Sequence, residues 1–281
     1  MSRNSGRWGQ VLTAMVTPMH GDGSIDYDGV ATLARYLQDN GNDGLVITGT
    51  TGESPVLTDE ERVNVWRAAA EAVTIPIIAG SGTNDTAHSV EMTVAAKDAG
   101  AAAVLAVTPY YNRPSQSGLY GHFKAIADCT DLPVMLYDIP IRSGRKIANE
   151  TFLKLIADCS NIVANKDAAK DPSSTALLLR DAPDYFEVYS GDSSLTIAFL
   201  AVGACGVVGV QSLDRRGAER DDRGVLQGRR RRRPRAQRRA GGQLRVRGQR
   251  RLSEPGAHQD GDAPPRTARG PVPSANGSGL T

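Results

Sequence analysis

Residues 133–167 of the chain read PVMLYDIPIRSGRKIANETFLKLIADCSNIVANKD. An apolar run opens this stretch, a segment of helical period follows near 149–159, and a second apolar run closes it at 161–167. Residues that favour turns and caps (Gly, Pro, Asn, Asp and Ser) stand at the junctions. Apolar runs on either side of a helical segment predict two parallel strands joined by a helix.

The same unit repeats outward from this stretch in both directions. Six further apolar runs predict strands at 11–18, 44–49, 75–82, 102–109, 186–192 and 206–210. Six further amphipathic segments predict helices at 27–40, 58–73, 85–99, 115–129, 173–182 and 193–203. Repeats of about 30 residues favour an α/β fold, a closed (β/α)8 TIM barrel. A doubly wound open sheet fits the same pattern, although the absence of a GxGxxG motif after the first strand weakens a dinucleotide-binding function.

Capping residues predict where several of these helices begin. Thr58 has Glu61 three positions further on, which is the pattern of a capping box. Asp85 precedes another helical run, and Asn149 precedes Glu150 at the start of the helix in the opening stretch. We expect all three to be N-terminal caps.

Length and cysteine content restrict the class of protein. A chain of 281 residues is too long for a small module stabilised by disulfides. Its three cysteines, Cys129, Cys159 and Cys205, form an odd set with no CxxC spacing, which predicts a reducing, cytoplasmic location. No apolar run approaches the roughly 20 residues that span a bilayer, so no membrane association is expected.

The charge divides the chain into two parts. Residues 1–210 hold 15 Lys and Arg against 24 Asp and Glu, a net charge of −9, whereas residues 211–281 hold 18 Arg and 7 Asp and Glu, a net charge of +11. We therefore expect a catalytic barrel over 1–210 that lacks its final helix, followed by a low-complexity basic tail over 211–281.

The tail has three interpretations. Its arginine run at 229–233 would attract polyanions without sequence specificity, so no specific nucleic-acid partner is expected. With only eight Val or Leu in 71 residues, it could also be disordered and without a role. We favour the third interpretation, translation out of frame, because 42 of those residues are Arg, Gly, Pro or Ala, whose codons begin with two G or C bases.

Polar residues gather where the predicted strands end, which is where barrels carry their active sites. They include Thr17, the segment 49–54, Tyr110, Tyr111, Tyr137, Lys166, Gly191 and Asp192. Desolvation at the end of an apolar run would lower the pKa of Lys166, and a neutral lysine can form a Schiff base with a ketone. A structural ion pair with Asp167 or with another carboxylate at the barrel end is the alternative, and Tyr137 taken alone fits a packing role better than a catalytic one.

Several segments together resemble a known family. They are GTTGES at 49–54, VTPYYNRPSQSG at 107–118, LYDIPIRSG at 136–144, Lys166, and SGD at 190–192. In this order they are similar to the pyruvate-dependent class I aldolases and lyases, and within these to the dihydrodipicolinate synthases, from about residue 11 to residue 210.

The resemblance implies a function and a set of catalytic residues. Lys166 would form a Schiff base with pyruvate, whose carboxylate Thr50 and Thr51 would hold. Tyr137 would transfer protons, linked to Thr50 and to a Tyr111 that the family supplies across a subunit interface. The implied reaction is condensation of pyruvate with L-aspartate 4-semialdehyde to 4-hydroxy-tetrahydrodipicolinate, in the biosynthesis of lysine and diaminopimelate, by a homotetramer.

Further positions follow from the same resemblance. Arg142 would bind the carboxylate of the aldehyde, while Gly191 and Val208 would line the site near the lysine. Asp138 departs from the Asn that many members carry there, with little expected effect on the chemistry.

No metal or other cofactor is expected, because the chemistry needs none and His20, His88, His122 and His258 show no ligand spacing. Two other functions remain open at this stage. One is a different 2-keto acid aldolase, such as an N-acetylneuraminate lyase, against which Arg142 argues. The other is an inactive barrel whose tail binds polyanions, against which the complete set of site residues argues.

Overall fold

The fold is seen in a computed structural model that describes residues 6–210. Its eight strands are β1 Val11–Ala14, β2 Gly44–Ile47, β3 Ile77–Gly80, β4 Ala103–Val107, β5 Val134–Asp138, β6 Ile162–Asp167, β7 Glu187–Ser190 and β8 Gly206–Gly209. The α-helices are α1 Tyr27–Asp39, α2 Asp59–Ala72, α3 Thr86–Asp98, α4 Gln116–Asp128, α5 Pro140–Ser143, α6 Asn149–Asp158, α7 Pro172–Asp181 and α8 Thr196–Ala201. Two short 3₁₀ helices, η1 Thr50–Gly52 and η2 Ser54–Val56, follow β2. Every predicted strand and helix is present, while α5, η1 and η2 were not predicted.

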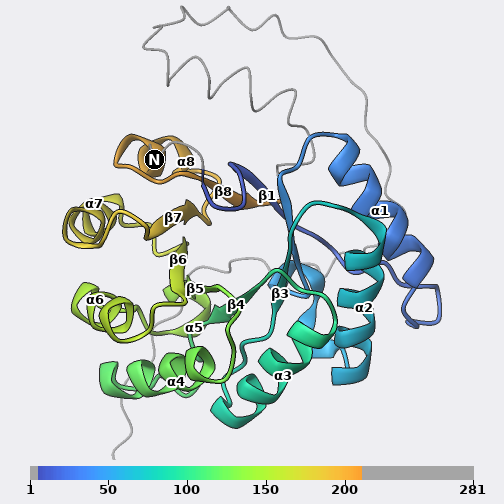
Figure 1. Ribbon diagram of the computed structural model, residues 1–281, viewed down its shortest axis with the longest axis horizontal. Coiled ribbons are helices and arrows are strands. Elements are labelled where there is room, and N and C mark those ends of the chain that lie inside the picture. The colour runs from blue at the N-terminus through green and yellow to red at the C-terminus, as the bar shows by residue number, and fades with distance from the viewer. Residues whose placement is uncertain (1–5, 211–281) are drawn as a thin grey trace, which may run out of the picture. The chain divides into compact units, whose positions relative to one another are not determined.

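The strands form a closed parallel barrel. Each strand pairs with the next along the chain, and β1 pairs with β8 to complete the ring, with Leu12 opposite Val208. Figure 1 shows the strands inside and the helices around them. Closure confirms the (β/α)8 barrel and rules out the open sheet that the sequence pattern allowed.

Two apolar layers stabilise the barrel, because alternate residues of a strand point to opposite faces of the sheet. The inner layer fills the ring with side chains such as Leu12, Val46 and Met135. The outer layer packs the helices against the sheet and contains the large side chains Trp66 and Phe123. A polar side chain near a strand's C-terminal end therefore faces either the barrel mouth or the layer between sheet and helices.

Two of the three predicted helix caps are confirmed. Thr58 forms the complete capping box with Glu61, and Asp85 accepts a hydrogen bond from the backbone of His88. The prediction for Asn149 was wrong: it is the first helical residue and Ala148 is the cap. Instead, Nδ2 of Asn149 donates to the backbone oxygen of Ser174 at 3.0 Å, and the Ser174 hydroxyl donates to Oδ1 of Asn149 at 3.1 Å. Contacts between α6 and α7 thus replace the local cap.

The predictions for the basic tail at 211–281, and for the helix that would normally follow β8, concern residues outside the described part of the chain. They stay predictions. Within residues 6–210, no helix combines the length and apolar character needed to cross a membrane.

Candidate active site

A cavity of about 640 Å³ opens at the C-terminal ends of the strands. Seven of the eight residues predicted from the sequence line it, namely Thr50, Thr51, Tyr137, Arg142, Lys166, Gly191 and Val208. They come from the loop after β2, from β5 and α5, from β6, from the loop after β7 and from β8. The barrel thus brings together residues that lie far apart in the sequence.

Lys166 is the buried cation of this cavity. It lies near the end of β6 and is 7% exposed. Burial, together with the smaller effect of the positive charge of Arg142, lowers the pKa of its ammonium to about 8. The Nζ atom lies 4.2 Å from the ring centre of Tyr137, its register partner on β5. An aromatic face stabilises the charged amine there, but less than water would, so the neutral nucleophilic form is accessible near neutral pH.

Gly191 leaves space for the lysine side chain. A Cβ atom at this position would lie 3.1 Å from Cγ of Lys166 and 3.1 Å from the backbone oxygen of Asp167. The Gly191 backbone also donates a 2.7 Å hydrogen bond to that same oxygen. Because the backbone passes so close to β6, any side chain at residue 191 would press on the lysine stem.

Tyr137 carries a hydroxyl that stays protonated. Burial raises its pKa to about 12, although the charge of Arg142 and a hydrogen bond with Thr50 act in the opposite direction. A protonated phenol beside an amine can donate a proton and, through its partner hydroxyl, accept one back.

The loop that carries Thr50 and Thr51 is tightly held. Gly52 donates a backbone hydrogen bond to Gly49, and Glu53 follows in the left-handed conformation with φ of 58°. Thr17 donates a 2.7 Å hydrogen bond to the backbone oxygen of Gly52. Thr17 was among the polar residues found at the strand ends in the sequence, and its hydroxyl anchors this loop.

A second, smaller cavity of about 200 Å³ adjoins the first. The two share Thr50, Tyr137, Ile139 and Arg142, and the smaller one continues toward Gly80, Leu105 and Tyr110. Tyr110 therefore lines a cavity, whereas its neighbour Tyr111 lines neither of the two.

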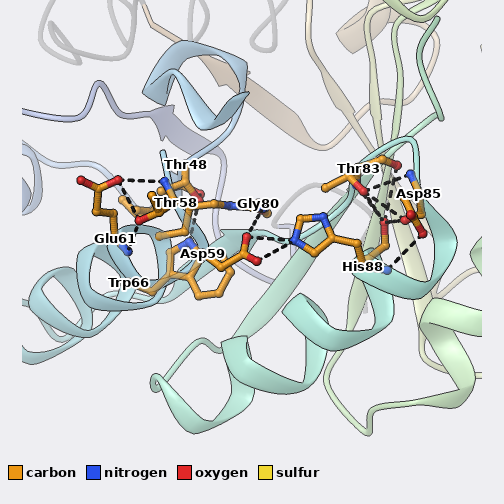
Figure 2. A network of polar contacts seen from close by, with 12 residues as sticks. Thr48, Thr58, Asp59, Glu61, Trp66, Gly80, Thr83, Asp85 and His88 are labelled. Atoms are coloured by element: carbon orange, nitrogen blue, oxygen red, sulfur yellow. Dashed lines mark hydrogen bonds and ion pairs between the residues drawn. The ribbon is translucent and has the colours of Figure 1, made fainter. Parts of the chain in front are cut away.

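A polar network behind this second cavity fixes its wall (Figure 2). Trp66 donates from Nε1 to the hydroxyl of Thr48 at 2.6 Å, and Arg62 donates to the backbone oxygen of Gly80 at 2.6 Å. Asp59, at the start of α2, faces His88 of α3 at 2.9 Å. These contacts attach α2 to the ends of β2 and β3, whose residues line the cavity, and join α2 to α3.

Tyr111 is the predicted site residue that the barrel leaves outside. Its side chain is 91% exposed, and its backbone adopts a positive φ of 74°. A non-glycine residue in the left-handed region is strained, and such strain is common at functional positions. Within the described part of the chain nothing covers this aromatic ring.

Two carboxylates lie behind the site, on the outer face of the same strand ends. Asp138 and Asp167 are register partners and are 1% and 6% exposed. Burial, together with the smaller effect of the neighbouring charge of Asp167, raises the pKa of Asp138 to about 7. The Asp167 carboxylate accepts hydrogen bonds from Thr175 at 2.6 Å and from the backbone of Ala169 at 2.9 Å, so the ion pair with Lys166 that was the alternative interpretation is not formed.

Sequence reasoning missed one charged residue of the larger cavity, Lys170, which lies in the loop between β6 and α7. Its signal in the sequence was only its position shortly after a strand end. Within residues 6–210, no group of three or more His, Cys, Asp and Glu side chains is arranged to hold a metal ion.

A (β/α)8 barrel whose strand ends enclose a buried lysine against a tyrosine defines a class of enzyme, the Schiff-base-forming lyases. The comparisons with known proteins specify it further. The model of the dihydrodipicolinate synthetase family matches residues 7–213, and the chain belongs to this family.

Named relatives agree with this family. The 4-hydroxy-tetrahydrodipicolinate synthase of Moorella thermoacetica is 52% identical over 206 residues, which are 73% of this chain and 70% of that protein. The synthase of Bacillus subtilis is 47% identical over 207 residues, covering 73% and 71%. Among solved structures, a dihydrodipicolinate synthase from Bacillus anthracis superposes with a TM-score of 0.77 at 43% identity, over 79% of this chain and 77% of that one.

Proposed function

We propose that the chain condenses pyruvate with L-aspartate 4-semialdehyde to give 4-hydroxy-tetrahydrodipicolinate and water. The relatives carry the name of this activity. The observation that carries the proposal is the buried Lys166, whose amine lies over the ring of Tyr137 inside the cavity.

In the first half-reaction the neutral amine of Lys166 attacks the ketone carbon of pyruvate, and loss of water gives a protonated imine. Tyr137, kept protonated by its raised pKa, supplies the proton that the leaving hydroxide needs. The hydroxyl of Thr50 supports this role, because its hydrogen bond to Tyr137 gives the proton a route onward.

In the second half-reaction the imine withdraws electrons from the pyruvate methyl group, which loses a proton to form an enamine. The enamine carbon attacks the aldehyde, the new alkoxide takes up a proton, and attack by the amino group of the aldehyde substrate on the imine carbon releases Lys166. Atoms balance, with one water lost when the first imine forms.

Binding of two carboxylates orients the substrates. Thr50 and Thr51, with their hydroxyls and backbone at one side of the cavity, are assigned to the carboxylate of pyruvate. Arg142 lines both cavities, and its planar guanidinium suits the carboxylate of the aldehyde. Gly191 and Val208 complete the wall around the lysine.

Tyr111 is assigned to the site of a second copy of the chain. Its exposed, strained position supports a role at an interface rather than inside its own barrel. We infer a homotetramer, in which Tyr111 of one copy joins Thr50 and Tyr137 of another. Light scattering of the purified chain measures this state, and a monomer with full activity would contradict it.

Reduction with borohydride in the presence of pyruvate tests the central assignment. A pyruvate adduct should form on Lys166 and be located by peptide mass spectrometry. An adduct on another lysine, or none on the folded protein, would overturn the Schiff-base assignment.

A further inference from the structure

Lys170 occupies a backbone conformation that a lysine adopts at a cost. Its φ is 61°, in the left-handed region that glycine enters freely. The loop around it is fixed by other groups, since Ala169 donates to Asp167 and the next residue, Asp171, caps α7. These contacts fix the conformation of the loop without the Lys170 side chain. We therefore ask which interaction of that side chain compensates for the backbone strain.

The side chain of Lys170 lines the same cavity as Lys166 and Arg142. It is 53% exposed, and its Nζ lies 3.4 Å from Oδ2 of Asp192. This contact uses at most one of the three donors of the ammonium, so the others can bind a ligand.

Asp192 does not depend on Lys170 for its position. Its Oδ1 accepts hydrogen bonds from the backbone and the hydroxyl of Ser194, at 2.9 and 2.5 Å, and from the backbone of Leu195 at 3.1 Å. These bonds to Ser194 are the main reason that the pKa of the Asp192 carboxyl lies below its usual value, with Lys170 contributing less. Lys170 is thus a cation at the cavity wall beside an acid that is already ordered.

The charges along the cavity matter for binding the carboxylates of the substrates. Residues 1–210 carry a net charge of −9, although the full chain carries +2, so cations are in the minority in the barrel. The charged residues along the cavity are Arg142, Lys166, Lys170 and Asp192, so the sign is reversed locally. Lys166 is assigned to pyruvate, which leaves Arg142 and Lys170 for the carboxylate of the second substrate.

We propose that Lys170 is a substrate-binding residue for the carboxylate of the aldehyde, acting beside Arg142 and setting the affinity for that substrate. The inference rests on the proposed function and adds to it a residue outside the catalytic set. Lys170 contributes through the charge and donors of its ammonium and takes no part in the bond-making steps.

The test compares variants of the full chain at residue 170. Lys170→Met removes the charge, Lys170→Gly removes the charge and the backbone strain, and Lys170→Arg retains the charge. Lys124→Met is the matched control, because Lys124 pairs with Asp128 on α4 at 2.8 Å and does not line the cavity. Measurements are the KM for each substrate, kcat, the thermal midpoint, and the pyruvate adduct trapped with borohydride.

We expect Lys170→Met and Lys170→Gly to raise the KM for the aldehyde about three- to tenfold at low salt, with kcat and adduct formation unchanged. The difference should shrink at high salt, as screening weakens the attraction. Lys170→Arg should restore the affinity, and Lys170→Gly should be at least as heat-stable as the parent.

The outcomes separate this inference from the proposed function. A trapped adduct together with an unchanged aldehyde KM in Lys170→Met would overturn the role of Lys170 alone. The same would follow if Lys124→Met raised that KM equally. Absence of the adduct in the unaltered chain would overturn the proposed function, and the role of Lys170 with it.

Discussion

The two faces of strands β5 and β6 carry similar groups in very different surroundings. On the inner face Tyr137 and Lys166 lie side by side and border the cavity. On the outer face the next residues along, Asp138 and Asp167, also lie side by side, in the layer between the sheet and the helices. One residue step along each strand separates the proposed catalytic pair from a buried carboxylate pair.

A shifted pKa has a different meaning on the two faces. Burial is the largest cause of the shift for Lys166, for Tyr137 and for both carboxyl groups. The two faces differ in whether their groups border a cavity that a substrate can enter. The outer carboxylates bind the backbone of Ile147 and the hydroxyl of Thr175, whereas the inner amine faces open volume. A shifted pKa therefore marks a functional group only where a cavity adjoins it.

The largest effect should come from the inner face at Lys166. Lys166→Ala removes the nucleophile, and turnover should fall by about 10³-fold or more, with no pyruvate adduct. Coupled turnover assays and borohydride trapping measure both, with circular dichroism as the control for folding. Retained turnover in a folded variant would contradict covalent catalysis.

The second inner residue should matter nearly as much. Tyr137→Phe keeps the ring over the amine but removes the hydroxyl, and kcat should fall by about 10²- to 10⁴-fold. Single-turnover experiments should still find the adduct, formed more slowly. A kcat within threefold of the parent would show that Tyr137 acts only in packing and not in proton transfer.

Arg142 lies at the edge of the cavity. Arg142→Ala should weaken binding of the transition state by about 2–4 kcal/mol, because a charge-assisted pair with a carboxylate is lost. The loss should appear in kcat/KM for the aldehyde, while the pyruvate adduct still forms. Equal loss for both substrates would show that Arg142 acts on the site as a whole.

The pH dependence sharpens the assignment of the amine. The pKa of Lys166 is lowered to about 8, so the rate of adduct formation should rise about tenfold per pH unit below that value and level off above it. Rapid-mixing experiments at saturating pyruvate measure this limb. A flat profile from pH 6 to pH 9, by the same reasoning, would mean that another step limits the rate.

The outer face should affect stability rather than chemistry. Because the folded-state pKa of Asp138 is about 7 and the unfolded value is 3.8, the folded state binds the extra proton between these values. Its contribution to the free energy of unfolding is present at low pH and is lost as the pH rises through about 7, with a slope of up to about 1.4 kcal/mol per pH unit.

Asp138→Asn cannot ionise and should flatten that slope, so the variant gains stability relative to the parent at pH values above about 7. Urea unfolding across this pH range gives the measurement. The pH limb assigned to Lys166 should not move. Parallel stability curves for parent and variant would show that Asp138 does not hold the proton.

The sequence predicted the elements of the fold well, because their signals are local. Apolar runs and helical periods fall within single elements, and a capping box such as that of Thr58 and Glu61 spans a few residues. The prediction for Asn149 failed because its amide found partners on α7, which no local pattern records. The short α5 was missed since a helix of this length has no measurable period.

By itself the sequence determined the order of strands and helices, the family, and the residues that gather at the strand ends, because each of these is written in short motifs or in local periodicity. Only the tertiary structure decided that the sheet closes, since closure depends on the pairing of β1 with β8 at opposite ends of the barrel sequence. It also decided which face each strand-end residue occupies, and so separated Lys166 from Asp167. For the same reason it placed Lys170 at the cavity wall: whether a loop side chain meets Asp192 depends on distances between loops that follow different strands, and no sequence pattern contains them.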